Sequence, residues 1–460
     1  MFFRQVLHDD LGCASYVVAD GGEAVVVDPK WEIEEYLALA EQEGFEITHV
    51  LETHNHADHL SGRGRLAEAT GATIHVPNAD EVDFDATAIG DGDVVEVGDA
   101  RIAAVATPGH RPEHLAYLVQ DRSRGDDPWM VLSGDSLFVG DLARPDLAVE
   151  AEEGARELYR SLQKLLRLED FVEVHPGHIG GSLCGGAGMS ETPGSTIGFE
   201  RRYNPLLTFA DEDDFVRELI SDLPPQPPNF QQIVELNRGP LLHEVAPLPP
   251  LEPNRVEELV DAGATVLDGR EPREYDAEHI PRSLNVTMAK AAVGTRAVWV
   301  VDPESDVVVL AATDEEARRL ARMLEAVGFR SLRGYVAGGI AAWRESGRPF
   351  ETTEAIDVPT LAKKLNAGEV DLLDVREEEA WRERHVDGSL HVPYHELGNA
   401  PPDAIRSRDG KPLAVACSAG NRSSLAASLL KRDGVEDVLH VAEGGVADLS
   451  DHGVELVGEG

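Results

Sequence analysis

Thr53-His54-Asn55-His56-Ala57-Asp58-His59 follows directly after the apolar run Ile47-Thr48-His49-Val50-Leu51. This histidine string holds four side chains that can bind a metal within six residues. Because side chains two apart along an extended chain point the same way, we expect His54 and His56 on one side of a turn that follows a strand. Imidazole and carboxylate groups suit zinc, iron and manganese. The string therefore predicts half of a mono- or dinuclear metal site at the carboxyl end of a strand.

Further candidate ligands recur at the ends of later apolar stretches. They lie in Thr107-Pro108-Gly109-His110, Leu132-Ser133-Gly134-Asp135 and His175-Pro176-Gly177-His178. Between Phe2 and about Pro176, short β-rich runs alternate with amphipathic stretches near 31–44, 61–70 and 152–167. This alternation predicts sheets flanked by helices, in an α/β or layered α+β domain.

Charge and length restrict the class of protein. The 460 residues exceed what one hydrophobic core usually supports, so we expect two to four domains. Asp and Glu number 85 against 41 Lys and Arg, giving a net charge of −44 that is spread along the whole chain. Such a surface repels itself unless salt screens it, which is typical of a high-salt, halophilic cytoplasm. It would also repel nucleic acid and anionic membranes, so we expect neither as a partner.

The cysteine count and the N-terminus favour a cytoplasmic protein. Cys13, Cys184 and Cys417 are too few and too scattered for a disulfide framework, which indicates a reducing compartment. The N-terminal residues contain no apolar core of signal-peptide length. No run of the sequence approaches the ~18 apolar residues of a membrane span.

Proline-rich segments and an internal repeat divide the chain. Prolines cluster between 222 and 254, which predicts a stiff, extended linker at the end of a first domain, 1–245. After residue 250, Asp268 overlays Asp374, and Gly338-Gly339 overlays Gly444-Gly445, at one constant offset without a gap. Two copies of one small α/β domain, 251–350 and 355–460, explain this repeat.

The motifs of the first domain occur in the order found in the metallo-β-lactamase fold superfamily, an αββα sandwich, and the domain resembles that superfamily. The resemblance gives no ligand role to His175, which we interpret as structural. It implies one metal position surrounded by His54, His56, His110 and Asp135, and a second surrounded by Asp58, His59, Asp135 and His178.

Within that superfamily, the chain resembles the persulfide dioxygenases more closely than the hydrolases. The resemblance implies a single Fe(II) held by His54, His110 and Asp135, with open positions for dioxygen and a sulfur ligand. Zinc, as one or two ions, is the alternative cofactor. The other four candidate ligands would then support the metal from outside or form a second metal site, namely His56, Asp58, His59 and His178.

Two further segments favour the oxygenase branch. Phe138 to Leu147 is similar to a segment whose arginine meets the carboxylate of a thiol carrier, and that role falls on Arg144. Gly181-Ser182-Leu183-Cys184-Gly185 is similar to a segment of members fused to sulfurtransferase domains, in which the cysteine lies near the iron. Glutathione-type members have a tyrosine where this chain has Gly180, so the thiol carrier is left open.

Cys417-Ser418-Ala419-Gly420-Asn421-Arg422-Ser423 follows an apolar strand and opens a helix expected from Ser424 to about Lys431. Backbone N–H groups and the helix N-terminus would stabilise a thiolate or a sulfur-borne anion in this cysteine loop. The loop resembles that of rhodanese sulfurtransferases, which implies that Cys417 carries a persulfide and Arg422 orients an anion. Asp374 and Arg376 belong to the supporting segment. In the first copy Ala311 overlays Cys417, so 251–350 is interpreted as an inactive rhodanese-like domain.

Together these features predict an Fe(II) persulfide dioxygenase with sulfurtransferase activity. Its partners would be a low-molecular-weight thiol persulfide, O2, and sulfite or thiosulfate; the direction of the sulfurtransferase step and assembly into a homo-oligomer are left open. Two alternatives stay open as well. One is a dinuclear-zinc thioesterase of the glyoxalase II type. The other is a sulfurtransferase alone, with a non-oxygenase sulfur-binding or regulatory module at the N-terminus.

Overall fold

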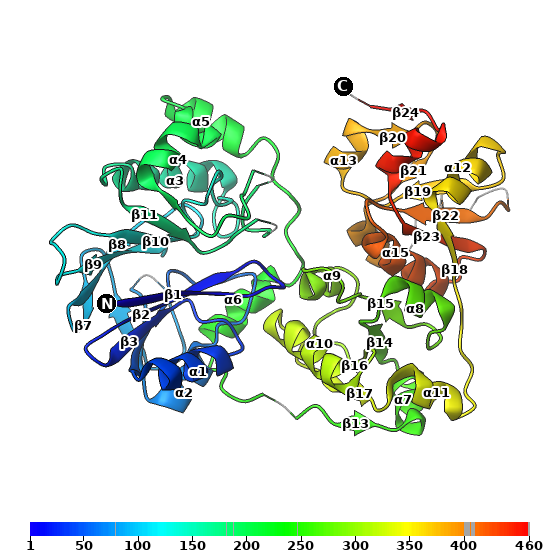
Figure 1. Cartoon of the computed structure of the whole chain (residues 1–460), viewed down its shortest axis with the longest axis horizontal. Coiled ribbons are helices and arrows are strands. Elements are labelled where there is room, and N and C mark those ends of the chain that lie inside the picture. Colours follow the sequence, from blue (N-terminus) through cyan, green and yellow to red (C-terminus); the bar gives the residue numbers. More distant parts are fainter. Residues whose placement is uncertain are drawn as a thin grey trace. The chain divides into compact units, whose positions relative to one another are not determined.

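We describe the chain from a computed structural model, which covers residues 1–78, 80–180, 182–186, 188–245, 247–399, 405 and 410–458. It divides into two compact units (Figure 1). Unit 1 comprises Met1–Val245 with Ala326–Gly328, and unit 2 comprises Ala246–Glu325 with Phe329–Gly460. No helix among the described residues is both long and apolar enough to cross a membrane.

Unit 1 is built on two six-stranded sheets. The first is antiparallel from β1 to β3 and parallel from β3 to β6; the second is antiparallel from β7 to β10, with a parallel step between β10 and β11. The strands of the first sheet are β1 (Phe2–Leu7), β2 (Ala14–Asp20), β3 (Glu23–Val27), β4 (Glu46–Leu51), β5 (Thr73–Pro77) and β6 (Thr87–Ile89). Those of the second are β7 (Val94–Val97), β8 (Ala100–Ala106), β9 (Leu115–Asp121), β10 (Met130–Gly134), β11 (Glu173–Pro176) and β12 (Ser195–Thr196).

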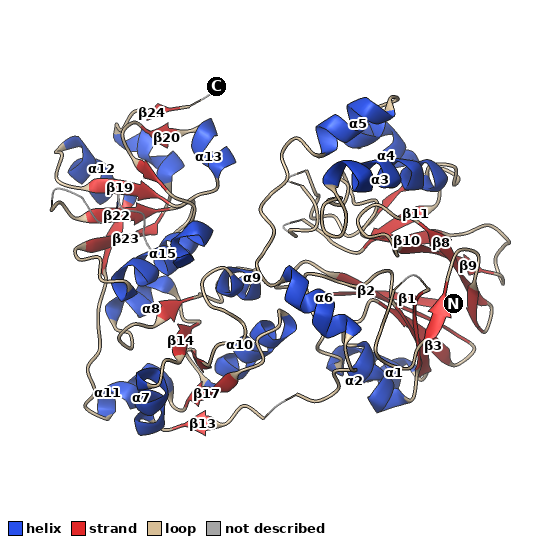
Figure 2. Cartoon of the chain, turned by 180° about the vertical axis from the view of Figure 1, so that it is seen from behind, coloured by secondary structure: helices blue, strands red, loops and turns tan. Residues whose placement is uncertain are grey.

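Helices cover the outer faces of both sheets, giving four layers in the order αββα (Figures 1 and 2). One core lies between the sheets and includes Val25, Leu51 and Leu132. Alternate residues of the strands, such as Val26 and Val50, point outward and pack against α1 and α2. A third core packs the second sheet against α3 and α5. The helices are α1 (Glu34–Glu43), α2 (Arg63–Thr70), α3 (Ala151–Leu165), α4 (Ile197–Tyr203), α5 (Glu212–Leu219) and α6 (Phe230–Arg238).

Helix α6 corrects the prediction of an extended linker over 222–254. Phe230, Ile233, Val234 and Asn237 recur at helical spacing and are all buried. Two amide side-chain contacts hold the histidine string to α6: Asn237 donates to the carbonyls of His56 and His59, at 3.1 and 2.9 Å. The segment between the two proline clusters is therefore an amphipathic helix of unit 1 and not part of an extended linker.

Unit 2 contains two parallel five-stranded sheets. The first repeat, 251–350, has the strand order β13-β17-β16-β14-β15, and the second repeat, 355–460, has the order β18-β23-β22-β19-β21. The strands of the first are β13 (Pro250–Leu251), β14 (Thr265–Asp268), β15 (Leu284–Asn285), β16 (Val307–Leu310) and β17 (Leu332–Val336). Those of the second are β18 (Glu354–Asp357), β19 (Asp371–Asp374), β21 (Leu390–His391), β22 (Leu413–Ala416) and β23 (Val438–Glu443).

The helices and smaller elements complete the two repeats. The helices of the first repeat are α7 (Pro253–Asp261), α8 (Pro272–Ala277), α9 (Val293–Val298), α10 (Asp314–Ala326) and α11 (Gly339–Glu345). The second repeat has α12 (Val358–Asn366), α13 (Glu378–Glu383), α15 (Asn421–Arg432), two 3₁₀ segments (Tyr394–Asn399 and Val446–His452) and a small ribbon of β20 (His385–Val386) with β24 (Leu456–Val457).

The internal repeat predicted from the sequence is confirmed strand by strand. Thr265 and Asp371 begin β14 and β19, 106 residues apart (371 − 265 = 106), and β15, β16 and β17 begin at the same offset from β21, β22 and β23. Helix α15 begins at Asn421, one turn earlier than expected from the sequence. The cysteine loop therefore runs directly into the first turn of this helix.

Candidate functional site

Three predicted ligands converge at the strand ends of unit 1. His54 follows β4, His110 follows β8 and Asp135 follows β10, so each side chain comes from the carboxyl end of a strand. Their ligand atoms lie within 4.8 Å of one another, and all three residues are buried. The fold thus brings together two imidazoles and one carboxylate, the first and last of which are 81 residues apart in the sequence (135 − 54 = 81).

Hydrogen bonds fix the orientation of both imidazoles. Thr53 donates its hydroxyl proton to Asp28 at 2.9 Å, so its Oγ1 accepts from Nδ1 of His54 at 2.8 Å. Nδ1 of His110 donates to the carbonyl of Arg144 at 2.8 Å. Each ring therefore keeps the lone pair on its Nε2, which is the atom directed into the cluster.

The cluster contains buried polar atoms that have no hydrogen-bond partner among the described residues. They include Nε2 of His54, Nε2 of His110 and Oδ2 of Asp135. Leaving such atoms unpaired costs about 1–3 kcal/mol each, and a bound cation would satisfy all three at once. The residues therefore fit a metal ion.

The protonation of these groups also suits metal binding. Burial and the neighbouring His56 and His110 lower the pKa of His54 well below 6.5, and burial lowers that of His110. Both rings are neutral at neutral pH. Burial would raise the pKa of Asp135, but His178 overrides it and brings the pKa to about 2. The three groups thus form a neutral–neutral–anionic ligand set.

A second group of potential ligands adjoins the first. Ligand atoms of His56, Asp58 and His59 lie within 4.8 Å of one another. His178 joins the two groups, because its Nδ1 lies 2.9 Å from Oδ1 of Asp135 and its Nε2 lies 2.9 Å from Oδ2 of Asp58. Of the second metal position implied by the sequence, His178 thus contacts both Asp58 and Asp135. His59 lies with Asp58 and with His56, a residue that the sequence assigned to the first position.

The cysteine loop of unit 2 surrounds a buried thiol. The N–H of Gly420 donates to Sγ of Cys417 at 3.2 Å, and Oγ of Ser423 lies 3.4 Å from the same sulfur. Gly420 has φ +88°, and a Cβ there would lie 2.6 Å from the carbonyl oxygen of Ala442. The loop conformation therefore requires glycine at this position.

Sequence profiles identify both parts of the chain. The Metallo-beta-lactamase superfamily matches residues 8–178, where both ligand groups lie. Residues 8–178 belong to the metallo-beta-lactamase superfamily. The Rhodanese-like domain matches residues 252–346 and 357–452, so the superfamily domain is followed by two rhodanese-like domains in tandem. The predicted fold class is confirmed.

Individual relatives cover the metallo-beta-lactamase domain. Hydroxyacylglutathione hydrolase of Rhodopseudomonas palustris is 32% identical over 176 residues, which are 37% of this chain and 63% of the hydrolase. The chain spans less than two thirds of the length of this hydrolase. The mitochondrial persulfide dioxygenase of Mus musculus is 27% identical over 245 residues, 52% of this chain and 87% of that protein.

One solved structure matches a larger share of the chain. A metallo-beta-lactamase from Staphylococcus aureus subsp. aureus COL superposes with a TM-score of 0.66 at 28% identity, covering 73% of this chain and 98% of that one. The similarity therefore extends beyond the matched residues 8–178 of the metallo-beta-lactamase domain.

Sequence reasoning missed two carboxylates behind the metallo-beta-lactamase ligands. Nε2 of His56 lies 3.2 Å from both Asp28 and Glu52. Burial would lower the pKa of His56, but these two hydrogen-bonded carboxylates raise it to about 10. With this pKa the ring is protonated at neutral pH, so Nδ1, which is buried without a hydrogen-bond partner, must lose its proton before it can bind a metal. Asp28 directly follows β3 and Glu52 directly follows β4, but no local sequence motif identifies either residue as a partner of His56.

Two further residues near the cluster were also missed. Nε2 of His114 accepts the N–H of Asp135 at 2.8 Å, and burial lowers the pKa of His114 to about 3, so it stays neutral. Sγ of Cys13 lies 3.2 Å from Asp58, and its backbone forms an isolated bridge with His178. His114 follows a ligand by four residues, which is a usable signal, whereas Cys13 is a lone cysteine in a loop.

The two predicted substrate residues differ in their surroundings. A ligand atom of Cys184 lies within 4.8 Å of those of Asp135 and His178. The guanidinium of Arg144 is buried and bonds both oxygens of Asp146, at 2.7 and 2.8 Å, and the carbonyls of Leu183 and Pro224. Gly181, the first residue of the Cys184 segment, lies outside the described residues. His175 contacts Phe3 and Tyr16, away from the ligand groups.

The predicted supporting residues of the cysteine loop form a local ion pair. Arg376 binds Asp374 through Nε and Nη2, the shortest contact being 2.6 Å, and the pair is buried. Arg422 is half-buried at the mouth of the loop, where Nη2 donates to Ser418 at 3.1 Å and Nη1 lies 3.6 Å from Glu377. Arg422 is therefore hydrogen-bonded to the cysteine loop through the side chain of Ser418.

Proposed function

We propose that the chain is an Fe(II)-dependent persulfide dioxygenase coupled to rhodanese sulfur transfer. In the first reaction a thiol persulfide, O2 and water yield the free thiol, sulfite and two protons. In the second, the Cys417 thiolate takes the sulfane sulfur of thiosulfate and releases sulfite, or a Cys417 persulfide gives its outer sulfur to sulfite and forms thiosulfate. The direction depends on which donor is in excess.

One observation carries the oxygenase proposal: His54, His110 and Asp135 bring two imidazole nitrogens and one carboxylate oxygen, all without other partners, to one buried position. Two histidines and one carboxylate on one face are typical of non-haem iron oxygenases. A bound Fe(II) would supply the redox chemistry that activates dioxygen, which zinc does not. The similarity to a mouse persulfide dioxygenase supports this proposal.

The residues of the chain would orient the ligands and the substrate. The Arg144 carbonyl and Thr53 fix the rings of His110 and His54. Cys184, beside Asp135 and His178, would border the persulfide. Arg144 would meet the carboxylate of the thiol carrier only in competition with Asp146, which already occupies its bidentate face.

The sulfurtransferase proposal rests on the cysteine loop. The Gly420 N–H already donates to Cys417 Sγ, and it would stabilise the anionic persulfide in the same way. Arg422 at the mouth of the loop would hold the sulfonate oxygens of thiosulfate or sulfite. Since both reactions share sulfite, their presence in one chain raises its local concentration at the second site.

Oxygen uptake tests the first reaction. We would reconstitute the full chain with Fe(II) and add glutathione, γ-glutamylcysteine or coenzyme A persulfide, in low and in molar KCl because of the net charge of −44. We expect uptake with one sulfite per O2 and loss of about a thousandfold in His54→Ala, while His175→Ala serves as the matched control. Bound zinc with no uptake from any persulfide would contradict the proposal.

A dinuclear hydrolase is the second candidate, because His56, Asp58 and His59 form a further group of potential ligands and His178 contacts Asp58. The similarity to a hydroxyacylglutathione hydrolase supports it. In that case two zinc ions per chain and thioester hydrolysis are expected, with loss of hydrolysis in Asp58→Ala. A third outcome, sulfite production that persists in Asp135→Ala, would leave only the sulfurtransferase.

A further inference from the structure

A buried ion pair joins the two repeats of unit 2. Asp276 lies on α8 of the first repeat, and His440 lies on β23 of the second. Oδ2 of Asp276 and Nδ1 of His440 are 2.6 Å apart, and the two residues are 4% and 0% exposed. The contact is therefore shielded from solvent, where a charged hydrogen bond is strongest.

His440 continues this contact to the cysteine loop. Its other nitrogen, Nε2, lies 2.9 Å from the carbonyl oxygen of Gly420. A carbonyl oxygen only accepts, so Nε2 of His440 donates to Gly420, and Nδ1 lies against the Asp276 carboxyl group. The first repeat thus places a carboxyl group against the histidine that contacts the cysteine loop.

Gly420 connects the His440 contact to the sulfur of Cys417. Its N–H donates to Cys417 Sγ, and its carbonyl precedes Asn421, the first residue of α15. Because Nε2 of His440 donates to that carbonyl, it fixes the peptide group between Gly420 and Asn421 at the helix N-terminus. It also holds Gly420 at φ +88°, the conformation that directs its own N–H toward the sulfur.

A second contact between the repeats holds the same helix. Ser424 Oγ donates to Oδ1 of Asn285 at 2.6 Å, and the Asn285 N–H donates to Ser428 Oγ at 3.2 Å. Asn285 belongs to β15 of the first repeat, and both serines lie on the first turns of α15. The first repeat is therefore in contact with the helix that begins at the cysteine loop.

The histidine and the carboxylate have no counterparts at the equivalent positions of the other repeat. At the offset of 106 residues, His440 corresponds to Gly334 and Asp276 corresponds to Arg382. The first repeat thus lacks the histidine, as it lacks the cysteine, while it alone supplies the carboxylate.

We propose that Asp276 of the first repeat is a positioning residue for the Cys417 loop, acting through His440 and Gly420. The repeat without a cysteine thereby completes the sulfur-transfer site of the other. This inference rests on the proposed sulfurtransferase function of the second repeat, and it gives the first repeat a role in that reaction.

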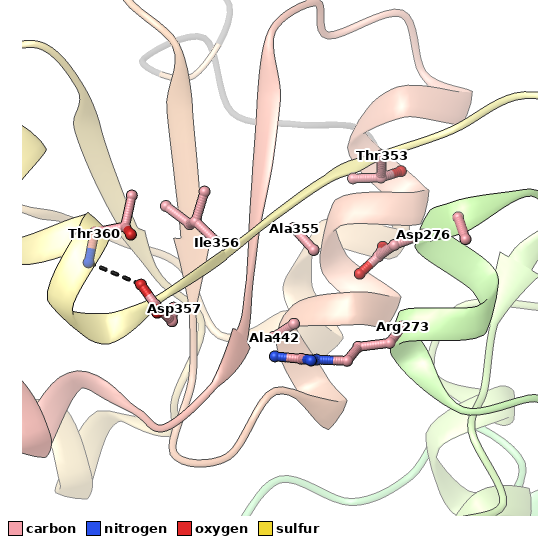
Figure 3. A pocket seen from close by; sticks show the side chains of 9 residues that line it. Arg273, Asp276, Thr353, Ala355, Ile356, Asp357, Thr360 and Ala442 are labelled. Atoms are coloured by element: carbon pink, nitrogen blue, oxygen red, sulfur yellow. Dashed lines mark hydrogen bonds between the residues drawn. The ribbon is translucent and has the colours of Figure 1, made fainter.

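The surroundings of Asp276 make substitution practicable. A pocket of about 510 Å³ lies between α8 and the edge of the second repeat, and Figure 3 shows Arg273, Asp276 and Ala442 among the residues that line it. The pocket offers room for the longer Glu side chain, and Asn has nearly the shape of Asp, so we expect both Asp276 variants to fold.

The experiment compares three variants of the full chain. Asp276→Asn keeps a hydrogen-bonding group but removes the carboxylate, and Asp276→Glu keeps the carboxylate. Arg273→Ala is the matched control: it removes an exposed ion pair with Glu443 between the same two repeats and does not touch the loop. The measurements are thiosulfate–cyanide sulfur transfer at steady state and the alkylation rate of Cys417 in the folded protein, followed by mass spectrometry.

We expect Asp276→Asn to slow both kcat and Cys417 alkylation about tenfold, with KM for thiosulfate changed less than twofold. Asp276→Glu should recover most of the loss, and Arg273→Ala should match the unchanged chain. Equal alkylation and transfer in Asp276→Asn and the unchanged chain would overturn the inference, as would a lowered melting temperature without slower alkylation. If the unchanged chain transfers no sulfur, the proposed function fails instead.

Discussion

The two repeats of unit 2 have the same scaffold but different loops. Arg270 binds Asp268 and Arg376 binds Asp374 with the same shortest contact of 2.6 Å, and each pair is buried. A histidine stacks on an aromatic ring in both, Tyr275–His279 at 4.0 Å and Trp381–His385 at 3.8 Å. What is retained in both copies therefore maintains the fold, and what differs carries the chemistry.

The loops differ at each position that would face the sulfur. Where the second repeat has Cys417, Gly420 and Arg422, the first has Ala311, Asp314 and Glu316. The acidic side chains would repel an anionic donor, and the glycine conformation is lost. A cysteine alone is therefore not expected to restore sulfur transfer to the first repeat.

The largest expected effect separates the two loops. Cys417→Ser should lower sulfur transfer by at least about a thousandfold and leave persulfide-dependent oxygen uptake unchanged, because the nucleophile is removed. Ala311→Cys in that background should not restore transfer. Both are measured as thiocyanate formed from thiosulfate and cyanide. Recovery in the double variant would show that the two loops are equivalent.

The shared ion pair provides the next comparison. Asp268→Ala and Asp374→Ala each leave a buried arginine unpaired, so each should reduce the free energy of unfolding of its repeat by about 3–5 kcal/mol. Chemical denaturation followed by hydrogen exchange of each repeat measures both costs. Glu378→Ala, which removes an exposed pair with Arg382, is the control and should cost less than about 1 kcal/mol. Unequal costs would contradict a common scaffold.

Acidification should destabilise the first repeat through its stacked histidine, His279. Burial lowers the pKa of His279 to about 4, so between pH 6.5 and pH 4 the unfolded chain binds a proton that the folded protein does not. Stability therefore falls as the pH drops, by about 2 kcal/mol from pH 7 to pH 5. His279→Gln should lose this dependence, so its stability deficit relative to the unchanged chain should narrow at pH 5. A stability deficit of His279→Gln that is the same at pH 7 and pH 5 would refute the lowered pKa of His279.

The smallest effect concerns a hydroxyl near the sulfur. Ser423→Ala removes the group that lies 3.4 Å from Cys417 Sγ, and a neutral hydrogen bond of this kind is worth about 1 kcal/mol. Transfer should slow about fivefold. Ala317→Ser, at the equivalent position of the first repeat, should change nothing. A loss above a hundredfold would mean that Ser423 transfers a proton rather than orienting the thiol.

Local motifs made the main part of the candidate site predictable from the sequence. His54, His110 and Asp135 each follow an apolar strand, so each motif could be recognised on its own, although β4 belongs to one sheet and β8 and β10 to the other. The Cys417 loop was equally recognisable, because the strand, loop and helix are contiguous. The constant offset predicted two copies of one domain, and four of the five strand pairs of their sheets begin at that offset.

The remainder depends on contacts between residues distant in sequence. Asp28 and Glu52 hold His56 from two different strand ends, and Cys13 reaches His178 from a loop 165 residues earlier (178 − 13 = 165). The partner of His440 lies in another repeat altogether. None of these pairings has a local pattern, because each depends on how the strands and repeats pack.

Helix α6 sets a limit on how short the metallo-beta-lactamase domain can be made. The superfamily match ends at residue 178, yet Asn237 binds the carbonyls of His56 and His59 and accepts the N–H of Ser61 at 3.0 Å. A chain cut at the first proline cluster would keep all the candidate ligands and lose the amide that ties down the backbone between them. Such a fragment should bind metal weakly, and its inactivity would say nothing about the ligands themselves.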